Sequence, residues 1–480
     1  MTTDEDVHAM LPVPNPTPSY WRSEPHHLDS HHSTPELPEE SDVVVIGAGL
    51  AGVSVACGFG CSHHLSGAPD PPSILLLEAR QTCSGATGRN GGHVKAKTTT
   101  LMQVAETLGR KASDEMARFV KAQIHALKDA VEREHIDCEF ELRRSYDVFV
   151  SEDDARAVEA AWRRGYLGKG YEWTRDVHWV GPESAERLTS VRGARGAFSV
   201  PACSFWPYKF VTGLLERSMA RNDRLNLQTE TPVLSVQAND DGSSVVHTAR
   251  GSVTAKKVIF ATNAYAAALL PKYRGVITPY KGTAAHLVTG DRKEPVFPHL
   301  SHTYNIEFGR KPGLETVDYL NPRPDGGIVV GGAKWIYQKE KELWYNNVDD
   351  STLVEPVMEA KYFDGYMQRN FKGWQDSGTE VDKVWTGSKL LSVLHVTDKA
   401  RANLLTVVMG STPDGAPHVG KVPGKQAQWI LAGFNGGGNA LVYLSAKAVA
   451  KMALDGVSLK ESGVEVPSFF ETTEERLGMA

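Results

Sequence analysis

The stretch that decides the fold is Asp42-Val-Val-Val-Ile-Gly-Ala-Gly-Leu-Ala-Gly52. Its apolar residues 43–46 predict a buried strand, and the small apolar residues that follow predict a helix packed closely on a sheet. In this Gly-x-Gly-x-x-Gly pattern, Gly47 permits a tight turn and Gly49 lets backbone N–H groups approach a pyrophosphate. Gly52 lets helix and strand close up, and the helix N-terminus favours the phosphate charge. The stretch therefore predicts a dinucleotide-binding turn.

Two further stretches support this interpretation. Residues 74–77 form a second apolar strand that ends at Glu78, which is placed to accept a hydrogen bond from a ribose hydroxyl. Residues 429–432 read as another buried strand and lead through a glycine-rich turn, residues 433–439, into a helix of small residues. Such a turn predicts a second cluster of backbone donors at a helix N-terminus. The alternative is that its three glycines only allow a tight turn.

Composition sets limits on size and partners. With 480 residues the chain is too long for one hydrophobic core, so we expect two domains. Its 41% hydrophobic and 23% charged residues are ordinary for a globular protein. The formal net charge of −6 and the absence of a basic run argue against nucleic acid and anionic membranes as partners. No apolar run approaches the roughly 20 residues that cross a bilayer, so we expect an intracellular, cytoplasmic protein.

Neither the cysteines nor the histidines predict a metal site. The five cysteines are an odd number without tandem pairs, so ordinary thiols are favoured over a redox pair at Cys57 and Cys61. Three histidine pairs stand in polar, loop-like sequence with no cysteine or acid at ligand spacing, which favours solvated loop histidines. These pairs are His26-His27, His31-His32 and His63-His64.

The order of the predicted elements indicates more than one domain. Prolines in residues 1–40 predict an extended N-terminal arm, which we expect Tyr20 and Trp21 to anchor on the folded body. A helix is predicted to begin near Ser113, and the strand and helix patterns after it indicate a second domain. Beyond Pro279 the sequence turns rich in strand patterns, which predict a large sheet. The candidate strands are residues 283–288, 304–308, 316–320 and 328–330.

The glycine turns and the loop Ser84-Gly-Ala-Thr-Gly-Arg-Asn-Gly-Gly-His93 carry a family resemblance. Over about residues 41–455 the chain resembles the FAD-dependent oxidoreductases of the D-amino-acid oxidase-like family. The loop is most similar to that of the gamma-glutamylputrescine oxidase branch. The resemblance implies an α/β fold: a Rossmann-like FAD-binding domain of the glutathione-reductase type and a second α+β substrate domain on a large mixed or antiparallel sheet. The implied FAD-binding domain comprises residues 41–112, 195–282 and 382–480, and the substrate-binding domain comprises residues 113–194 and 283–381.

The resemblance also implies which positions hold FAD. The first glycine turn would contact the pyrophosphate, the acid after the second strand would contact the adenosine ribose, and the loop would follow the pyrophosphate and flavin. One strand position would contact the adenine, a strand end would close over the dinucleotide, and the second glycine turn would reach the flavin ring. In chain order these positions are Gly47, Gly49, Gly52, Glu78, Arg80, Ser84, Gly85, Ala86, Thr87, Arg89, Asn90, Gly91, Gly92, Val233, Ala261, Thr262, Gly433, Asn435, Gly436, Gly437, Gly438 and Asn439.

The reaction that the resemblance implies is oxidation of a C–N bond in a small-molecule amine or amino acid. Hydride would pass to flavin, with dioxygen as acceptor and hydrogen peroxide as product. His93 would contact the isoalloxazine, by a hydrogen bond in preference to a covalent link. Lys281 is the candidate cation for oxygen reduction, with a solvated surface lysine as the alternative. Sarcosine oxidases attach flavin through a cysteine, and this chain has no cysteine after Cys203, so we expect noncovalent FAD.

Two questions stay open at this stage. Residues 388–408 interrupt a segment that is nearly continuous in similar family members, either as a functional insertion near the flavin or as sequence absent from a functional product. The chemistry also has alternatives. One is a dehydrogenase or metabolite-tailoring oxidase that uses another acceptor, and another is a catalytically silent protein with an FAD fold. The sequence predicts neither a specific substrate nor an oligomeric state.

Overall fold

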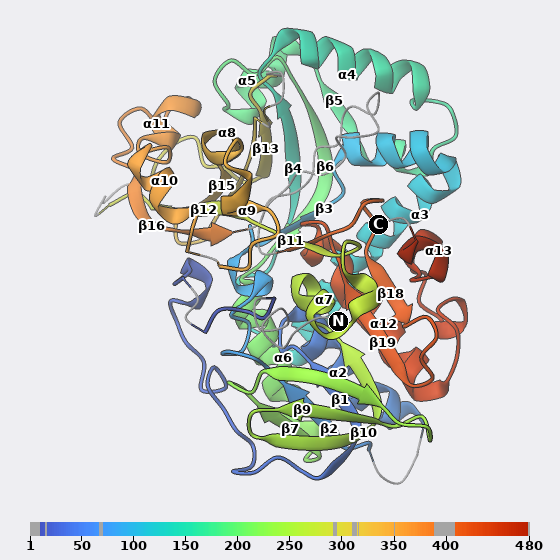
Figure 1. Cartoon of the computed structure of the whole chain (residues 1–480). Coiled ribbons are helices and arrows are strands. Elements are labelled where there is room, and N and C mark those ends of the chain that lie inside the picture. The colour runs from blue at the N-terminus through green and yellow to red at the C-terminus, as the bar shows by residue number, and fades with distance from the viewer. Residues whose placement is uncertain are drawn as a thin grey trace.

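The computed structural model contains two large β-sheets with helices packed on them (Figure 1). The structure describes residues 10–14, 17–66, 71–290, 295–309, 314, 316–349, 351–387 and 409–478. One sheet has a parallel centre flanked by helices, and the other is mixed. The predicted α/β class with a second large sheet is therefore confirmed.

The eight-stranded sheet contains the stretch that decides the fold. Its central strand β1 (Glu40–Ile46) pairs in parallel with β10 (Gly251–Phe260) on one side and β2 (Ile74–Leu77) on the other. The order is β18-β19-β10-β1-β2-β7, with β9 on β10 and β8 on β9. The remaining strands are β7 (Leu225–Gln228), β8 (Val233–Ala238), β9 (Ser244–Thr248), β18 (His418–Lys421) and β19 (Gln428–Ala432).

Helices cover this sheet and bury its apolar strands. Parallel strands are buried on both faces, and Val44 and Val45 of β1 are fully buried. Helix α2 (Leu50–Ser66) follows the first glycine turn and packs against α12 (Gly438–Asp455), which follows the second. The helix predicted after residues 433–439 therefore exists, and both glycine turns lie at the start of helices in one layer.

The nine-stranded sheet is the second layer of the fold. Its order is β16-β12-β15-β14-β13-β4-β6-β3, with β5 on β6. All pairs are antiparallel except β13 with β4, so the sheet is mixed. The four strands expected beyond residue 279 are present as β12 to β15. The bounds are β3 (His93–Lys95), β4 (Glu141–Phe149), β5 (His178–Val180), β6 (Gly196–Ser204), β12 (Gly282–Val288), β13 (Thr303–Glu307), β14 (Val317–Pro322), β15 (Ile328–Gly332) and β16 (Glu380–Gly387).

Helix α3 (Thr98–Glu134) consists of two helical segments. The first begins at Thr98, and the second follows a break at Gly109, whose φ is +85°, so a helix does begin close to the start predicted near Ser113. Ser113 is buried inside the helix, where its hydroxyl donates to the Leu101 carbonyl at 2.8 Å. An acidic pair after a serine looks the same in sequence whether it caps a helix or restarts one after a kink.

The other regular elements are short or lie at the periphery. Strands β11 and β17 form a separate antiparallel pair. The bounds are β11 (Thr278–Tyr280), β17 (Met409–Ser411), α4 (Glu152–Gly165), α5 (Pro182–Thr189), α6 (Pro207–Arg221), α7 (Ala266–Leu269), α8 (Lys334–Tyr337), α9 (Lys341–Trp344), α10 (Val354–Glu359), α11 (Tyr366–Asn370) and α13 (Glu474–Leu477).

The N-terminal arm is anchored as predicted. Tyr20 and Trp21 lie in a short 3-10 helix, η1 (Tyr20–Arg22), and both side chains are buried. The predicted domain boundaries stay a prediction. β3 and β6 pair in the nine-stranded sheet although both fall in ranges expected in the FAD-binding domain.

Two smaller expectations concern thiols and membranes. The four cysteines whose side chains the structure describes, Cys57, Cys83, Cys138 and Cys203, are buried, and Cys83, Cys138 and Cys203 are free thiols, as expected. Among the described residues, no helix combines the length and the apolar character needed to cross a membrane.

Candidate functional site

A cavity opens where the carboxyl ends of β1, β2 and β10 face the N-termini of α2 and α12. In open α/β sheets, ligands bind at this edge. Most of the positions predicted to hold a cofactor line the cavity. They are Gly47, Gly49, Glu78, Arg80, Gly85, Ala86, Thr87, Asn90, Gly91, Val233, Ala261, Thr262, Gly436, Gly437, Gly438 and Asn439, with His93.

The remaining predicted positions pack behind the lining. They are Gly52, Ser84, Arg89, Gly92, Gly433 and Asn435. The Arg89 guanidinium illustrates their role: it is buried, and its Nε donates to the Ser84 carbonyl at 2.8 Å. A buried cation used in this way shapes the loop and does not face a ligand.

The first glycine turn leaves no room for side chains. Gly47 has a φ of +106°, and a Cβ there would lie 2.8 Å from the Ala261 carbonyl oxygen. A Cβ on Gly52 would lie 1.8 Å from the Gly47 carbonyl oxygen. A Cβ on Gly49 would lie 3.1 Å from the Thr87 hydroxyl. Backbone alone therefore forms this wall of the cavity.

Backbone donors hold the acid at the end of β2. Glu78 Oε2 accepts from the Ala48 N–H at 2.8 Å, and Oε1 accepts from the Arg80 N–H at 3.0 Å. These bonds fix the carboxylate beside the first glycine turn. Each carboxylate oxygen has two lone-pair directions, so Glu78 can accept further hydrogen bonds from a ligand.

The loop 84–92 and the second glycine turn meet at two asparagines. The Asn439 Nδ2 donates to Asn90 Oδ1 at 2.8 Å, and the Asn90 Nδ2 donates to Asn439 Oδ1 at 3.2 Å. Asn90 also donates to the Thr87 carbonyl and accepts from the Gly92 N–H, each at 2.8 Å. Two segments 349 positions apart in the sequence therefore share one wall of the cavity.

The segment after residues 388–408 supports the second glycine turn. The Asn435 N–H donates to the Gly410 carbonyl at 3.0 Å, and Asn435 Oδ1 accepts from the Thr412 N–H at 2.8 Å. Residues 388–408, the suspected insertion, lie outside the described residues. The glycine-bearing segment that follows them is in contact with the turn.

Two uncharged polar side chains face the cavity from the nine-stranded sheet. His93 of β3 and Tyr319 of β14 line it with ring centroids 5.6 Å apart. Burial, and then the charge of Lys95, holds the pKa of His93 far below its ordinary value, so the imidazole is neutral. Among the described residues, His93 Nδ1 and the Tyr319 hydroxyl have no hydrogen-bond partner. Both atoms are buried polar groups without a partner in this part of the structure.

Tyr319 was not predicted as a site residue. Its ring packs where two glycines leave space: a Cβ on Gly91 would lie 2.7 Å from the ring, and a Cβ on Gly331 would lie 2.1 Å from it. Gly331 faces Tyr319 directly across the β14–β15 pair. Both Tyr319 and Gly331 are visible in the sequence, and a glycine opposite an aromatic residue indicates a packed ring. Only the strand register shows that the two residues face each other.

A comparison with protein families decides the identity of the chain. The model of the FAD dependent oxidoreductase family, DAO, matches residues 42–452. The chain belongs to this family. Its cofactor is FAD.

Curated relatives are distant. A probable oxidoreductase OrdL from Rhizobium meliloti is 25% identical over 309 residues, which cover 62% of this chain and 64% of that protein. The gamma-glutamylputrescine oxidoreductase of Escherichia coli is 27% identical over 375 residues, which cover 75% of this chain and 76% of that protein. The match spans less than two thirds of the Rhizobium protein and 54% of an OrdL protein from Haemophilus influenzae.

Solved structures share the fold. The L-proline dehydrogenase from P. horikoshii has a TM-score of 0.63 at 19% identity and covers 90% of this chain and 98% of its own. The glycine oxidase from Geobacillus kaustophilus has a TM-score of 0.63 at 17% identity and covers 91% and 99%. At such identities the likeness shows the fold alone, and the substrate does not follow from it.

The residues of the cavity fit FAD. The wall formed by Gly47 and Gly49 lets a diphosphate approach the N-terminus of α2, whose dipole favours negative charge. The N-terminus of α12, 18 residues long, faces the same cavity through Gly437 and Gly438. Both helix ends are suited to a large anionic cofactor.

Lys281 differs from one of the two expectations made for it. It is fully buried, so it is not a solvated surface lysine. Its Nζ donates to the Thr352 hydroxyl at 2.6 Å and to the Asp349 carbonyl, and it is not among the residues that line the FAD cavity. A cation near the flavin from this position stays a prediction that the geometry does not favour.

The side chains of His26, His27 and Glu216 lie close together, which the sequence did not predict. His26 and His27 lie within 3.9 Å and 3.7 Å of the Glu216 carboxylate, and these atoms are close enough together to share a metal ion. The acid comes from α6, so sequence spacing gave no sign of it. The His27 side chain is exposed and that of Glu216 is half-buried, and exposed groups of this kind are common without a metal.

Proposed function

We propose that this FAD-dependent oxidoreductase oxidises a C–N bond of a small-molecule amine or amino acid and that dioxygen is the electron acceptor. The observation that carries the proposal is the uncharged hydrogen-bonding pair, His93 and Tyr319, in the cavity of a DAO-family protein. Hydride transfer needs the unprotonated amine, and neutral partners favour that form over an ammonium ion. The loop 84–93 supports the same class because of its resemblance to amine oxidases.

Four groups of residues would hold FAD. The backbone at Gly47 and Gly49 and the N-terminus of α2 would hold the pyrophosphate, and Glu78 would accept from the adenosine ribose. The loop 84–92 would lie along the pyrophosphate and flavin. The N-terminus of α12 at Asn439 would lie near the flavin ring, where its dipole would stabilise negative charge.

When bound, FAD supplies the hydride acceptor for the carbon beside the amine nitrogen. The chain supplies position and exclusion of water. Tyr319 is fixed between two backbone segments, so its hydroxyl offers a hydrogen bond at one defined place. His93, neutral and buried, can accept the amine N–H at Nδ1. Together they would orient the substrate nitrogen and leave the adjacent C–H free to react.

The specific alternative is an electron acceptor other than dioxygen. The match in fold to an L-proline dehydrogenase is as good as the match to a glycine oxidase. The buried contacts of Lys281 also weaken the argument for an oxygen-activating cation. A dehydrogenase that passes electrons to another acceptor would use the same cavity.

Peroxide and flavin absorbance separate these functions. Purified yellow protein is supplied with a panel of primary and secondary amines and amino acids, in air and without oxygen. An amine oxidase forms hydrogen peroxide in air, and its flavin bleaches without oxygen. Anaerobic bleaching without peroxide identifies a dehydrogenase. Absence of both with every substrate, in protein that retains FAD, contradicts the proposal.

A further inference from the structure

The N-terminal arm, described over residues 10–14 and 17–39, forms part of the cofactor cavity. Leu11 and Pro12 line the cavity, together with residues of the glycine turns. Leu11 also packs against the apolar cluster beneath β1 and β10. A further arm group, the Val13 carbonyl, accepts from Arg80 Nη1 at 3.2 Å. The arm therefore closes one side of a cavity whose other walls come from the folded body.

The same arm holds the loop 84–92 by its backbone. The Ser19 hydroxyl donates to the Gly88 carbonyl at 2.5 Å, and the Trp21 indole N–H donates to the Asn90 carbonyl. From the loop side, Arg89 Nη1 and Nη2 donate to the hydroxyl and carbonyl of Thr17, each at 2.7 Å. All of these groups are buried or partly buried, so their loss would leave unpaired polar atoms.

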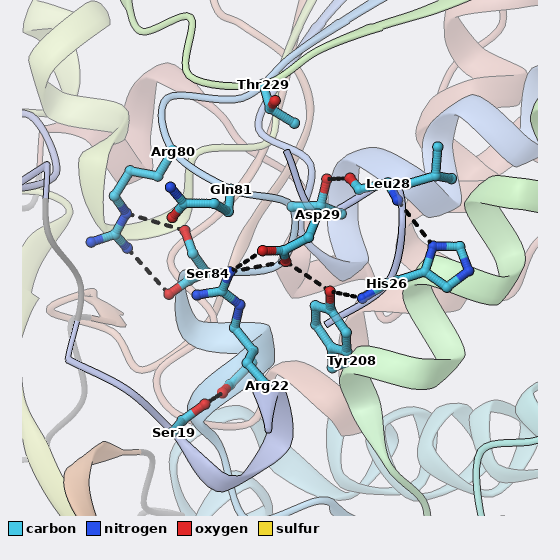
Figure 2. Close-up of polar contacts among 12 residues, drawn as sticks. Ser19, Arg22, His26, Leu28, Asp29, Arg80, Gln81, Ser84, Tyr208 and Thr229 are labelled. Atoms are coloured by element: carbon cyan, nitrogen blue, oxygen red, sulfur yellow. Dashed lines mark hydrogen bonds and ion pairs between the residues drawn. The ribbon is translucent and has the colours of Figure 1, made fainter. Parts of the chain in front are cut away.

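A second attachment keeps the arm in place further along the chain (Figure 2). Arg22 Nη2 donates to both carboxylate oxygens of Asp29 at 2.9 and 2.8 Å, and the Tyr208 hydroxyl donates to the same carboxylate at 2.7 Å. The Asp29 carbonyl accepts from the Thr82 N–H at 2.9 Å. Figure 2 also shows Arg80 donating to Ser84, which braces the start of the loop. The arm is thus fixed at both ends of the loop.

The Trp21 contact has a consequence inside the cavity. A trans peptide is planar, so the carbonyl of Asn90 and the N–H of Gly91 point in opposite directions. Because the Trp21 indole binds this carbonyl, the Gly91 N–H is directed away from Trp21, and Gly91 lines the cavity. The Trp21 ring also fills the space beside Gly92, where a Cβ would lie 2.6 Å from it. Trp21 therefore sets the orientation of loop backbone that faces FAD.

We propose that the N-terminal arm is a positioning element of the FAD site: Trp21 and Thr17 hold the loop 84–92 in its binding shape, and Leu11 closes the cavity. The arm thereby sets how long FAD stays bound. Trp21 acts through Asn90 and Gly92 and is a positioning residue. The proposal rests on FAD as the cofactor and not on the substrate, so it stands or fails independently of amine oxidation.

The test compares two tryptophans that each donate one indole hydrogen bond to a carbonyl. Trp21→Phe removes the donor to Asn90, and the control Trp374→Phe removes the donor to the Pro298 carbonyl, in the core of the nine-stranded sheet away from the cavity. Dissociation of FAD from the purified holoprotein is followed by the rise of free-flavin fluorescence. We expect dissociation about fivefold to tenfold faster for Trp21→Phe and unchanged for the control.

A second variant and a second readout separate positioning from general loss of stability. Leu11→Ala shortens a cavity wall without touching a hydrogen bond, and we expect dissociation about twofold to fivefold faster. The visible circular dichroism of bound flavin is expected to change in Trp21→Phe and not in Trp374→Phe. Unchanged dissociation in both Trp21→Phe and Leu11→Ala, or an equal acceleration in Trp374→Phe, overturns the proposal.

Discussion

The two sheets that meet at the FAD cavity solve the problem of burial in different ways. In the eight-stranded sheet, residues 43–46 of β1 and 74–77 of β2 are apolar and buried, and backbone at glycines shapes the site. In the nine-stranded sheet, fully buried charges stand among the strands: Lys95 of β3 donates to the Ser145 hydroxyl at 2.6 Å and to Asp147 at 3.1 Å. The site wall in the first sheet depends on glycines that carry no side chain. The stability of the second sheet depends on the pairing of buried charged side chains.

This difference shows which kind of change each region tolerates. A glycine that contacts backbone cannot accept any side chain, whatever its polarity. A buried charge cannot lose its partner, although the pair as a whole can be replaced by apolar residues. Substitutions at a packed glycine and substitutions of one member of a buried charge pair therefore test the two regions separately.

The largest effect is expected at Gly52. A side chain at this position would stand 1.8 Å from the Gly47 carbonyl oxygen, so Gly52→Val must push α2 away from β1. We expect the purified protein to contain no FAD, measured by the ratio of absorbance near 450 nm to that at 280 nm. Gly60→Ala is the control in the same helix, because a Cβ there meets no atom within 4 Å. Normal yellow protein from Gly52→Val would contradict the close packing of turn and helix.

The buried pair of the nine-stranded sheet gives the next largest effect. Asp147→Leu leaves the Lys95 ammonium fully buried without its carboxylate, and we expect a loss of about 3–5 kcal/mol in the free energy of unfolding, measured with urea. The double variant Lys95→Met with Asp147→Leu is expected to recover most of that loss. At the exposed pair of Arg118 and Glu172, Glu172→Gln is the control and is expected to cost less than about 1 kcal/mol. Equal losses at both pairs would contradict the role of burial.

The contrast between the sheets also explains what the sequence could predict. The turn at Gly47 to Gly52 and the strands beside it follow from local pattern, because apolar runs and glycine spacing carry the information within about ten residues. The second turn, with Asn439, was predicted for the same reason. Its hydrogen bonds with Asn90 were not, because side-chain pairing across 349 positions has no local signal.

Other features depended on contacts that pattern does not encode. Tyr319 reaches the cavity because of its register with Gly331, and Lys281 is buried because its partners, Thr352 among them, come from a separate segment. The helical segment that begins at Thr98, before the break at Gly109, was not predicted. The arm was predicted to dock through Tyr20 and Trp21, but its place beside the loop 84–92 follows only from the folded structure.

His418 of β18 is a buried titratable side chain of the eight-stranded sheet and makes the stability of the protein depend on pH. Burial first, and then the charge of Arg476, lowers the pKa of His418 to about 3, against an ordinary value of 6.5. Its folded pKa lies below its unfolded pKa, so its contribution is fully present above pH 6.5 and is lost as pH falls from 6.5 towards 3. From this group we expect a loss of about 2 kcal/mol between pH 6.5 and pH 5.

Urea unfolding of the wild type and of His418→Gln at several pH values checks this expectation. The variant keeps a polar side chain near the Thr472 hydroxyl, which His418 Nδ1 contacts at 2.9 Å, but it has no group that titrates in the range. Its stability is expected to fall less steeply below pH 6.5 than that of the wild type. Parallel curves would show that other groups carry the pH dependence.

The smallest effect is expected for substitutions of Asn90 and Asn439, whose side chains pair between the loop 84–92 and the second glycine turn. Asn90 and Asn439 join the loop 84–92 to the start of α12 by two amide hydrogen bonds, so each asparagine acts partly through the other. We expect Asn439→Ala and Asn90→Ala each to weaken FAD binding about fivefold to tenfold, measured by titration of the apoprotein. The double variant is expected to be weakened by less than the product of the two factors, because the second substitution removes a bond already lost. Independent, multiplicative effects would mean that the two halves of the cavity hold FAD separately, and the joint between them would then be a contact without function.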